Sequence, residues 1–383
     1  MRNIKTLSLA LHKEHRGKIE INPKVKLNSP LDLSLAYTPG VAEVCKAIAK
    51  NPKNALAYTI KGNTVAVVTD GSAVLGLGDQ GPLAALPVME GKCAIFKKFA
   101  GVDAFPVCLN TKEPKSIIET VKNIAPVFGG INLEDISAPN CFIVEKELSK
   151  NLSIPVFHDD QHGTSIVVLS GLINSLKVVK KQVGKIRIVV NGAGSAGIAI
   201  TKLLLAYGAK NIILLDSKGI ISQKRDSLNP HKKEMLKFLL KEPSTGRLEV
   251  ALKEADVFIG VSEGNILKKS YIKLMKKDPI VFALANPTPE IDPKIAHEAS
   301  VKIMATGRSD FPNQLNNALV FPGFFKGLLS GKISKVTEKM KLDVATALSS
   351  LIKNPTTEEI IPSIFDKRVV ETVAKAVMGT IKS

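Results

Sequence analysis

The sequence has few of the residues that mark secreted or metal-stapled proteins. Its 383 residues include no tryptophan and only four cysteines, and aromatic residues make up 5%. The cysteines, Cys45, Cys93, Cys108 and Cys141, lie far apart and form no C-x-x-C pair. A disulfide framework and a structural zinc site are therefore not expected, and the cysteine usage fits a reducing, cytoplasmic location.

Long apolar runs are also missing. No stretch approaches the roughly 20 consecutive apolar residues that a transmembrane helix needs, so we predict a soluble protein without a membrane partner. The first 13 residues are basic with a short apolar centre. They lack a small-residue cleavage site, and Glu14 and Glu20 follow closely, which argues against a transit peptide.

Negative charge is scarce relative to positive charge. The chain has 53 lysines and arginines against 35 aspartates and glutamates, a formal net charge of +18. The lysines are spread along the chain, without an aromatic stacking platform or an arginine-rich stripe, so nucleic acid is not an expected partner. A generally lysine-rich composition explains the charge, and a field that attracts anionic small molecules is the alternative.

The sequence does contain short apolar runs that alternate with helix-length amphipathic stretches, which is typical of parallel α/β sheets. "APVFGGINLEDIS" (125–137) carries apolar residues up to Glu134 and Asp135, and helix spacing follows over 138–151. "IPVF" (154–157) is then the next strand. This β–α–β order places the ends of neighbouring strands at one edge of the sheet, where open α/β sheets bind ligands.

Carboxylates gather at that edge. "IPVF" ends in "HDDQH", so we expect Asp160 to lie close to Glu134 and Asp135. Three carboxylates there require a compensating cation, and all-oxygen ligands favour Mg²⁺ or Mn²⁺ over zinc. Taken alone, each cluster has a simpler explanation. Asp159 or Asp160 would cap a helix that starts near Gly163, and Glu134 and Asp135 would form a solvated turn. Together they favour a metal.

The second half opens with a strand, "IRIVVN", that runs directly into a G-x-G-x-x-G motif. The motif comprises Gly192, Ala193, Gly194, Ser195, Ala196 and Gly197. A helix and a second strand follow, and Asp216 ends that strand about 20 residues beyond the last glycine, as suits an acid that binds the adenosine ribose. The glycines allow a pyrophosphate to approach a helix N-terminus, so we predict NAD or NADP as cofactor.

Two further stretches are ambiguous. "GLGDQG" (76–81) repeats the glycine pattern, but Asp79 would point charge at a pyrophosphate and no strand abuts its first glycine. We interpret it as a flexible turn near the substrate. "ALANPTPE" (283–290) places Asn286 at a strand end where the nicotinamide would lie, although an ordinary Asn-Pro turn explains it equally well.

These patterns predict two α/β domains. The first, over 1–160, is an α/β domain that binds substrate and metal. The second, over 161–383, is a Rossmann-type doubly wound dinucleotide-binding domain with C-terminal helices.

A dinucleotide beside a divalent metal suggests a dehydrogenase for a 2-hydroxy acid, in which the metal polarises the new carbonyl so that a β-carboxylate leaves as CO₂. Such chemistry needs a base for the hydroxyl and an acid for the enol carbon. Tyr37, before a Thr-Pro-Gly turn, and Lys92, inside an apolar run, are candidates. Burial would lower the pKa of Lys92 towards that of a useful base. Each residue taken alone is more simply structural.

Six motifs together resemble the small, prokaryotic-type malic enzyme family. They are "SLAYTPGVA", "LGLGDQGPLAALPVMEGK", "NLEDISAPNCF", "VFHDDQHGT", "NGAGSAG" and "NNALVFPG". The similarity covers the chain from about residue 10 to about residue 380. The resemblance implies oxidative decarboxylation of (S)-malate to pyruvate and CO₂ by a cytoplasmic homodimer.

By position, the resemblance makes Tyr37 the general acid and Lys92 the general base, which also contacts the substrate. It makes metal ligands of the three carboxylates named above, Glu134, Asp135 and Asp160. Asp159 lies beside them as a partner, and Asn286 and Asn317 would contact malate or nicotinamide. Larger malic enzymes have an arginine that grips a malate carboxylate where this chain has Val74, so the partner of the second carboxylate stays unidentified.

Two alternatives remain at this stage: another metal-dependent β-decarboxylating dehydrogenase, for malate analogues such as tartrate, and a non-catalytic dinucleotide-binding regulator. For the cofactor we favour NAD. Asp216 can accept hydrogen bonds from both ribose hydroxyls and would repel the 2′-phosphate of NADP. Lys218 or Arg225 could neutralise that phosphate, so dual use is the alternative.

Overall fold

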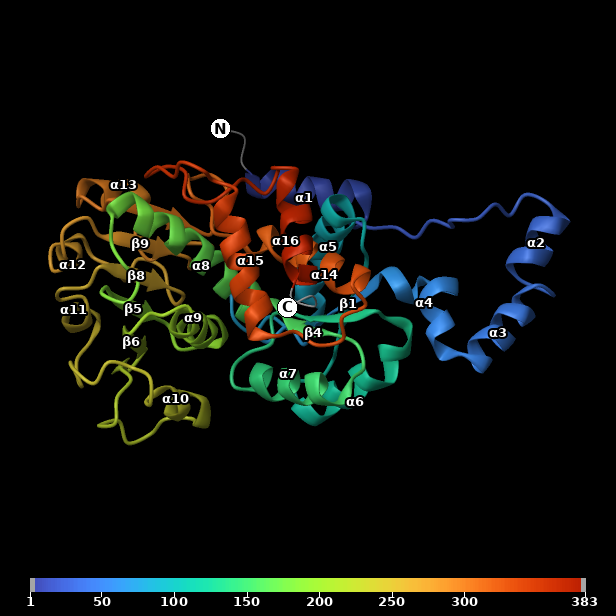
Figure 1. The fold of residues 1–383 in the computed structure, drawn as a ribbon, viewed down its shortest axis with the longest axis horizontal. Helices are drawn as coiled ribbons and strands as arrows, with labels where there is room; N and C mark the ends of the chain where they lie inside the picture. The colour runs from blue at the N-terminus through green and yellow to red at the C-terminus, as the bar shows by residue number, and fades with distance from the viewer. Residues whose placement is uncertain (1–3, 380–383) are drawn as a thin grey trace.

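Two mainly parallel sheets organise the computed structural model, which describes residues 4–379 (Figure 1). The first sheet has four parallel strands in the order β2-β1-β3-β4. Its strands are β1 (Thr64–Thr69), β2 (Asp103–Cys108), β3 (Gly130–Leu133) and β4 (Val156–His158). The strands predicted before the two acidic clusters are thus present as β3 and β4.

Strand β1 shows why this sheet is covered on both faces. All six of its residues are buried, and successive side chains point to opposite faces. Val65 and Val67 pack in the core with α5 (Pro82–Ile95), whereas Ala66 and Val68 pack in the core with α6 (Pro114–Ile124) and α7 (Asn140–Asn151). The π-helical turn η3 (Phe96–Ala100) extends α5, and η4 (Ala125–Val127) extends α6.

The second sheet has six strands in the order β10-β9-β8-β5-β6-β7, all parallel except β7. They are β5 (Arg187–Asn191), β6 (Asn211–Asp216), β7 (Gly219–Ile220), β8 (Val257–Gly260), β9 (Ile280–Ala283) and β10 (Ile303–Thr306). Its helices are α9 (Ser195–Ala206), α10 (Pro230–Met235), α11 (Leu248–Ala251), α12 (Lys269–Ile272) and α13 (Pro293–Glu298). The chain reverses direction across the sheet beside β5, which confirms the predicted doubly wound, Rossmann-type class.

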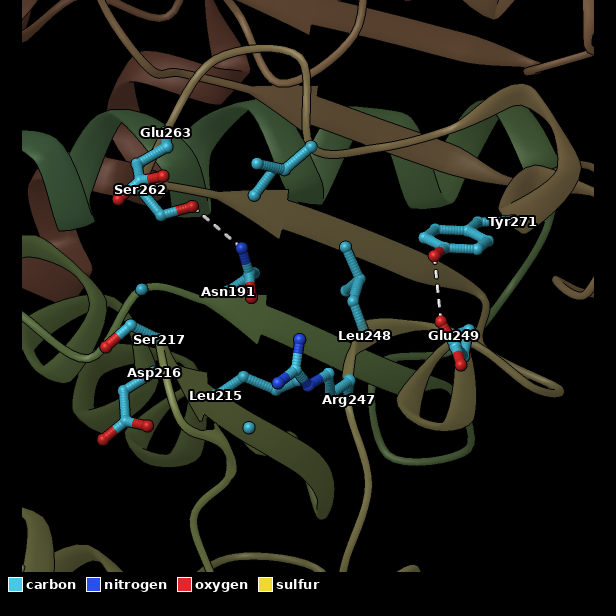
Figure 2. A pocket seen from close by; sticks show the side chains of 13 residues that line it. Asn191, Leu215, Asp216, Ser217, Arg247, Leu248, Glu249, Ser262, Glu263 and Tyr271 are labelled. Carbon is cyan, nitrogen blue, oxygen red and sulfur yellow. Dashed lines mark hydrogen bonds between the residues drawn. The ribbon is translucent and has the colours of Figure 1, made fainter.

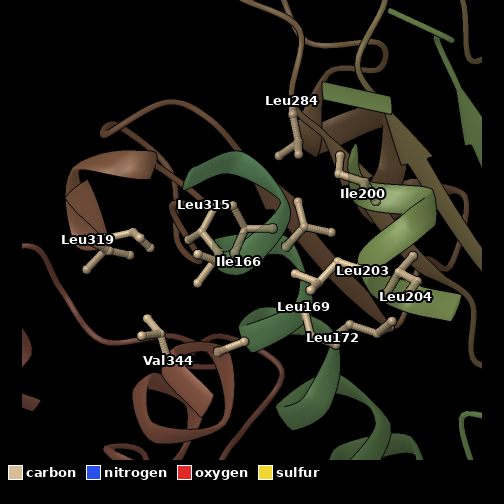
Figure 3. Close-up of a cluster of buried hydrophobic side chains, with 14 of the residues drawn as sticks. Ile166, Leu169, Leu172, Ile200, Leu203, Leu204, Leu284, Leu315, Leu319 and Val344 are labelled. Atoms are coloured by element: carbon tan, nitrogen blue, oxygen red, sulfur yellow. The ribbon is translucent and has the colours of Figure 1, made fainter. Parts of the chain in front are cut away.

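One long helix, α8 (Asp159–Val179), lies between the sheets. Figure 3 shows Ile166, Leu169 and Leu172 of α8 packed among apolar side chains of α9, with Val344 of α15 nearby. The remaining C-terminal elements are η5 (Asn317–Leu319), α14 (Phe321–Ser330), α15 (Glu338–Ser350) and α16 (Arg368–Gly379). Within 4–379, α8 is the one helix long and apolar enough to cross a membrane, but most of it is buried inside the protein, as a core helix would be.

The N-terminal helical elements differ from the other described helices in having no buried residue. They are α1 (Ile4–His15), α2 (Pro30–Ala36), α3 (Val41–Lys50), η1 (Pro52–Asn54), α4 (Ala55–Tyr58) and η2 (Ile60–Asn63). Figure 1 shows α2 and α3 projecting from the rest of the molecule at the right. We refer to residues 28–60 as the arm.

Asn174 links α8 to the C-terminal part of the chain. Its buried amide donates hydrogen bonds to the carbonyl oxygens of Ser349 and Ile360, both at 2.9 Å. Replacing it by alanine leaves two buried acceptors unpaired, so we expect Asn174→Ala to lower the free energy of unfolding by about 2 kcal/mol or more. Denaturant titration followed by circular dichroism measures this, with Asn151→Ala, at the exposed end of α7, as control. Equal shifts in both variants would contradict the assignment.

Candidate active site

Four carboxylates meet at the C-terminal edge of the first sheet. Glu134 and Asp135 follow β3, and Asp159 and Asp160 begin α8 directly after β4. One oxygen of each of Glu134, Asp135 and Asp160 lies within 4.8 Å of the other two. The backbone of Asp135 is left-handed, with φ 51°, and its N–H donates to Asp160 Oδ2 at 2.8 Å. Such strain in a non-glycine residue is typical of functional sites.

The simpler explanations of these acids are wrong in detail. Glu134 and Asp135 are buried, so they do not form a solvated turn. The helix expected near Gly163 already begins at Asp159, and no side chain caps it. The arrangement is therefore not accounted for by capping.

Burial disfavours the charged form of these carboxylates. It is the largest cause that raises the pKa of Glu134 to about 7, of Asp135 to about 9 and of Asp160 to about 6. Repulsion from Asp160 raises the pKa of Asp135 further, and Asp135 Oδ2 is buried without a hydrogen-bond partner among residues 4–379. Three buried oxygen ligands that need positive charge fit a divalent cation such as Mg²⁺ or Mn²⁺.

Lys92 reaches the same cluster from α5. Its buried ammonium lies 2.5 Å from Glu134 Oε2, forms an ion pair with Asp159 and sits 4.4 Å from the centroid of the Phe321 ring. The expectation that burial leaves Lys92 with a lowered pKa is wrong. Burial does act in that direction, but the attraction of Asp159 and Glu134 outweighs it and raises the pKa above its ordinary value. Lys92 is therefore charged in this arrangement.

Asp159 is held by the residues around it. Its side chain is fully buried, and burial raises its pKa to about 7 although Lys92 opposes the shift. A Cβ on Gly163, one turn later, would lie 1.9 Å from Asp159 Oδ1 and 3.1 Å from the Cβ of Asn317. A side chain at position 163 would thus push Asp159 and Asn317 apart, and the structure places Asn317 beside Asp159.

Several polar residues around the acids are not predictable from the sequence pattern. Asn132, in β3, donates to Glu134 Oε2 at 3.0 Å. Glu145, in α7, accepts from the backbone N–H of His158 at 3.0 Å and pairs with His162 Nε2 at 2.7 Å. Asp70, directly after β1, is buried and pairs with the Ser72 hydroxyl at 2.6 Å. A carboxylate at a strand end was the available signal for Asp70, whereas Asn132 and Glu145 carry no local signal.

The glycine motif forms the turn that a dinucleotide requires. Gly192 has φ 118°, and a Cβ there would lie 2.5 Å from the carbonyl oxygen of Val261. A Cβ on Gly197 would lie 1.7 Å from the carbonyl oxygen of Gly192, so the start of α9 packs directly on the turn. These close approaches leave backbone N–H groups at a helix N-terminus free to bind phosphate.

A cavity of about 430 Å³ opens beside that turn (Figure 2). Residues at the ends of β5, β6 and β8 line it together with Arg247, namely Asn191, Gly192, Asp216, Ser217 and Ser262. Asn191 donates to the Ser262 hydroxyl at 2.8 Å, which joins two of the strand ends. The position of the cavity at the C-terminal edge of a doubly wound sheet fits the adenosine half of a dinucleotide.

Asp216 is not a free acid in this cavity. Its carboxylate pairs with Arg225 at 3.0 Å and with Lys232 at 2.7 Å, and it accepts the backbone N–H of Lys218 at 2.9 Å. Burial alone would raise its pKa, but these partners hold the pKa at about 2. The predicted ribose-binding acid is thus ionised and already neutralised by two cations.

The two sheets approach each other where Asn286 follows β9. A Cβ on Gly76 would lie only 1.5 Å from the carbonyl oxygen of Asn286, so the turn at 76–81 packs against this segment. Glu290, buried nearby, accepts the backbone N–H groups of Ser262 and Ala285, both at 3.1 Å. The turn therefore lies between the first sheet and the predicted nicotinamide position.

Tyr37 lies apart from the carboxylates and from Lys92. It follows α2 in the arm, its surface is 67% exposed, and no contact with the carboxylates or Lys92 is present within the described chain. Its assignment as general acid stays a prediction.

Comparison with known proteins covers almost the whole chain. The model of the malic enzyme N-terminal domain matches residues 16–149, and that of the malic enzyme NAD binding domain matches 161–382. The chain is 54% identical to a bifunctional malic/malolactic enzyme of Bacillus subtilis, over 97% of this chain and 91% of that one. It is 56% identical to an NAD-dependent malic enzyme of Geobacillus stearothermophilus, over 94% and 76% respectively.

Solved structures show the same relationship. The NAD-dependent malic enzyme from Thermotoga maritima is 49% identical and superposes with a TM-score of 0.94, over 97% of this chain and 99% of that one. Malic enzyme from Pyrococcus horikoshii is 47% identical, with a TM-score of 0.94, over 99% and 91% respectively.

The carboxylate cluster makes a prediction that does not depend on turnover. Asp160→Asn keeps the shape of the ligand but removes its charge, so we expect Mn²⁺ to bind about tenfold more weakly or worse. Isothermal titration calorimetry of the purified protein measures this. Asp79→Asn, an exposed carboxylate paired with Lys112, serves as the control and should bind Mn²⁺ like the parent. Unchanged affinity in Asp160→Asn would exclude Asp160 as a ligand.

Proposed function

Because the chain belongs to the malic enzyme family, we propose that it oxidatively decarboxylates (S)-malate to pyruvate and CO₂, using NAD in preference to NADP. The observation that carries the proposal is the burial of Lys92 against Asp159 and Glu134 at the edge where three carboxylates meet. A non-catalytic dinucleotide-binding regulator would have no use for this costly arrangement of buried charges.

Glu134, Asp135 and Asp160 are proposed to hold the divalent cation. When bound, Mg²⁺ or Mn²⁺ supplies a Lewis acid that polarises the oxygen on C2 of the substrate. The three carboxylates come from the ends of β3 and α8, which are rigid elements, so the ligand positions are fixed before the ion arrives. The Asn132 amide fixes the orientation of Glu134 in the same way.

Lys92 is proposed to receive the hydroxyl proton of malate as the hydride leaves C2 for the nicotinamide. Asp159 keeps the Lys92 side chain aimed at the cluster, and its attraction holds Lys92 in the charged form before the reaction. Lys92 would therefore accept the hydroxyl proton only after it has given up its own, which becomes easier if a divalent cation competes with the ammonium for Glu134. Asn317, which lies beside Asp159, and Asn286, which packs against the turn at Gly76, are proposed to contact malate or the nicotinamide.

Tyr37 is proposed to protonate the enol carbon after CO₂ has left. A phenol suits this step because its O–H can donate a proton to the enol carbon, which becomes strongly basic once CO₂ has left.

For the cofactor we infer a preference for NAD. Similar proteins include malic enzymes named as NAD-dependent and as NADP-dependent, so the family alone does not decide. In this chain Asp216 occupies the position of the ribose-binding acid, with Arg225 and Lys232 already bound to it. The Asp216 carboxylate can therefore accept hydrogen bonds from the ribose hydroxyls only through the lone pairs that these contacts leave free. Arg225 and Lys232 are not available to bind the 2′-phosphate of NADP.

Three further proposals concern the division into domains, the location in the cell and the assembly of the protein. The first is a functional division at residue 160, which falls inside the first turn of α8, although one apolar core runs from the first sheet into the second. The second is a cytoplasmic location, and the third is a homodimer that acts on a small-molecule substrate without nucleic acid or membrane.

The activity itself is tested by following NADH formation with malate and Mn²⁺. We expect EDTA to abolish turnover and Mn²⁺ or Mg²⁺ to restore it. Lys92→Ala should lower kcat at least about 100-fold, because the hydroxyl proton then has no acceptor. Lys98→Ala, an exposed lysine in η3 of the same helical segment, is the control. Full activity of Lys92→Ala, or of the enzyme in EDTA after dialysis, would exclude the mechanism.

Cofactor choice is tested by kcat/KM for NAD and NADP. Asp216→Asn removes the carboxylate and releases Arg225 and Lys232 to bind a 2′-phosphate. We expect the ratio of the two constants to move towards NADP by about tenfold, equivalent to about 1.4 kcal/mol. Asp226→Asn, an exposed acid in the same loop, should leave the ratio unchanged. A parent enzyme that already prefers NADP tenfold would overturn the role given to Asp216.

A further inference from the structure

Glu290 is a buried acid to which the proposed reaction assigns no role. It lies between β9 and α13, and the residue has no exposed surface. Burial raises its pKa to about 7, and the groups that oppose this rise are backbone N–H groups rather than cations. A buried carboxylate without a cationic partner is costly to maintain, so we expect it to serve a function that offsets the cost.

Each oxygen of the Glu290 carboxylate holds one turn of the backbone. Oε1 accepts the N–H of Ser262, in the loop after β8, at 3.1 Å. Oε2 accepts the N–H of Ala285, in the segment after β9, at 3.1 Å. Because β8 and β9 are neighbouring parallel strands, both turns lie at the same edge of the second sheet. One side chain therefore joins the ends of two strands.

The backbone around this carboxylate leaves room for it. A Cβ on Gly260, the last residue of β8, would lie 2.4 Å from Glu290 Oε1. A Cβ on Gly264 would lie 2.7 Å from the carbonyl oxygen of Thr288. The N–H of Leu267 also donates to the carbonyl oxygen of Glu290 at 2.9 Å. The segment that carries Glu290 therefore lies directly against the loop after β8, and its carboxylate fills the space that a side chain at position 260 would need.

The turn at Ser262 forms part of the cavity beside the glycine motif. Ser262 lines that cavity, and its hydroxyl accepts a hydrogen bond from Asn191, at the end of β5, at 2.8 Å (Figure 2). The carbonyl oxygen of the preceding residue, Val261, lies 2.5 Å from the position of a Cβ on Gly192. Movement of this turn would therefore displace both the lining of the cavity and the first glycine of the motif.

The turn at Ala285 carries the other end of the predicted cofactor site. Asn286 follows directly, and its carbonyl oxygen packs against the turn at Gly76. The side-chain nitrogen of Asn286 lies 2.8 Å from the position of a Cβ on Gly307. Neighbouring backbone thus confines Asn286 on two sides, and the hydrogen bond from Ala285 to Glu290 holds the backbone immediately before it.

We propose that Glu290 is a positioning residue whose ionised carboxylate holds the turns after β8 and β9 at the separation that lets one dinucleotide contact both. The inference rests on the proposed function, since it takes NAD as the ligand of both turns. An ionised carboxylate accepts one N–H at each oxygen. A neutral carboxamide offers one acceptor oxygen and turns its NH₂ group towards the second N–H, so it can hold only one turn.

The stability of the fold does not explain the charge on Glu290. Its pKa is raised above the ordinary value of a glutamate, so folding favours the neutral form of this group. The stability that the neutral form contributes is lost as the pH rises through the folded-state pKa of about 7. At pH 8 a neutral side chain of the same shape would therefore serve the fold at least as well, whereas it would release one of the two turns.

Cofactor binding tests the proposal without turnover. NADH is titrated into the parent protein and into Glu290→Gln at pH 8, without malate, and binding is followed by the fluorescence of the nicotinamide. We expect Kd to rise about tenfold in Glu290→Gln, as suits the loss of one hydrogen bond to a charged group, while the melting temperature does not fall. Glu298→Gln, an exposed acid of α13 paired with Lys269, is the control and should change neither quantity.

The malate assay separates positioning of the cofactor from a general loss of structure. We expect KM for NAD to rise about tenfold in Glu290→Gln, whereas kcat at saturating NAD falls less than about threefold, because bound cofactor itself holds both turns. The affinity for Mn²⁺ should not change, because Glu134, Asp135 and Asp160 lie at the edge of the other sheet. A Mn²⁺ affinity that falls together with the NADH affinity would overturn the assignment.

The remaining outcomes separate the two levels of inference. A parent protein that does not bind NADH would overturn the proposed function. A parent that binds NADH, together with a Glu290→Gln variant that binds it equally well, would overturn the positioning role alone. A melting temperature that falls together with the NADH affinity would show that Glu290 serves the fold as a whole, which also overturns that role.

Discussion

The buried charge cluster of one lysine and four carboxylates is the constraint on which the rest of this structure depends. Taking Lys92, Asp159 and Glu134 out of water is costly, and removing Lys92 would leave two buried carboxylates without their cationic partner. The cluster joins α5, β3 and α8, so it fixes three elements relative to one another. The glycine at 163 and the amide of Asn132 have their positions because this cluster has to be accommodated.

The features that could be predicted from the sequence are those that depend on residues close together in the chain. Strand-end acids such as Glu134 and Asp160 and the glycine turn at 192–197 follow from the alternation of strands and helices, because parallel strands bring their ends to one edge. The fold class follows for the same reason. The local apolar run had already made Lys92 a candidate base. The residue-level resemblance to malic enzymes then added Asn317, which the local pattern alone would not have selected.

What could not be predicted depends on residues distant in the chain. The sign of the Lys92 pKa shift was mistaken, because burial was visible in its apolar neighbourhood whereas the opposing attraction came from acids 42 and 67 positions later. The neutralisation of Asp216 by Arg225 and Lys232 likewise depends on how a loop folds back. The exposed position of Tyr37 had no signal at all, since its helix has the composition of an ordinary packed one.

The contact between Gly76 and the Asn286 carbonyl makes the spacing of the two sheets a matter of backbone alone. The turn after β1 and the segment after β9 touch there without an intervening side chain, so no rotamer can adjust the gap. Any side chain at position 76 would act as a wedge that pushes the two segments apart while leaving every proposed reacting group chemically intact. In the proposed reaction, the distance that a hydride has to cross would in this way depend on the absence of a single carbon atom.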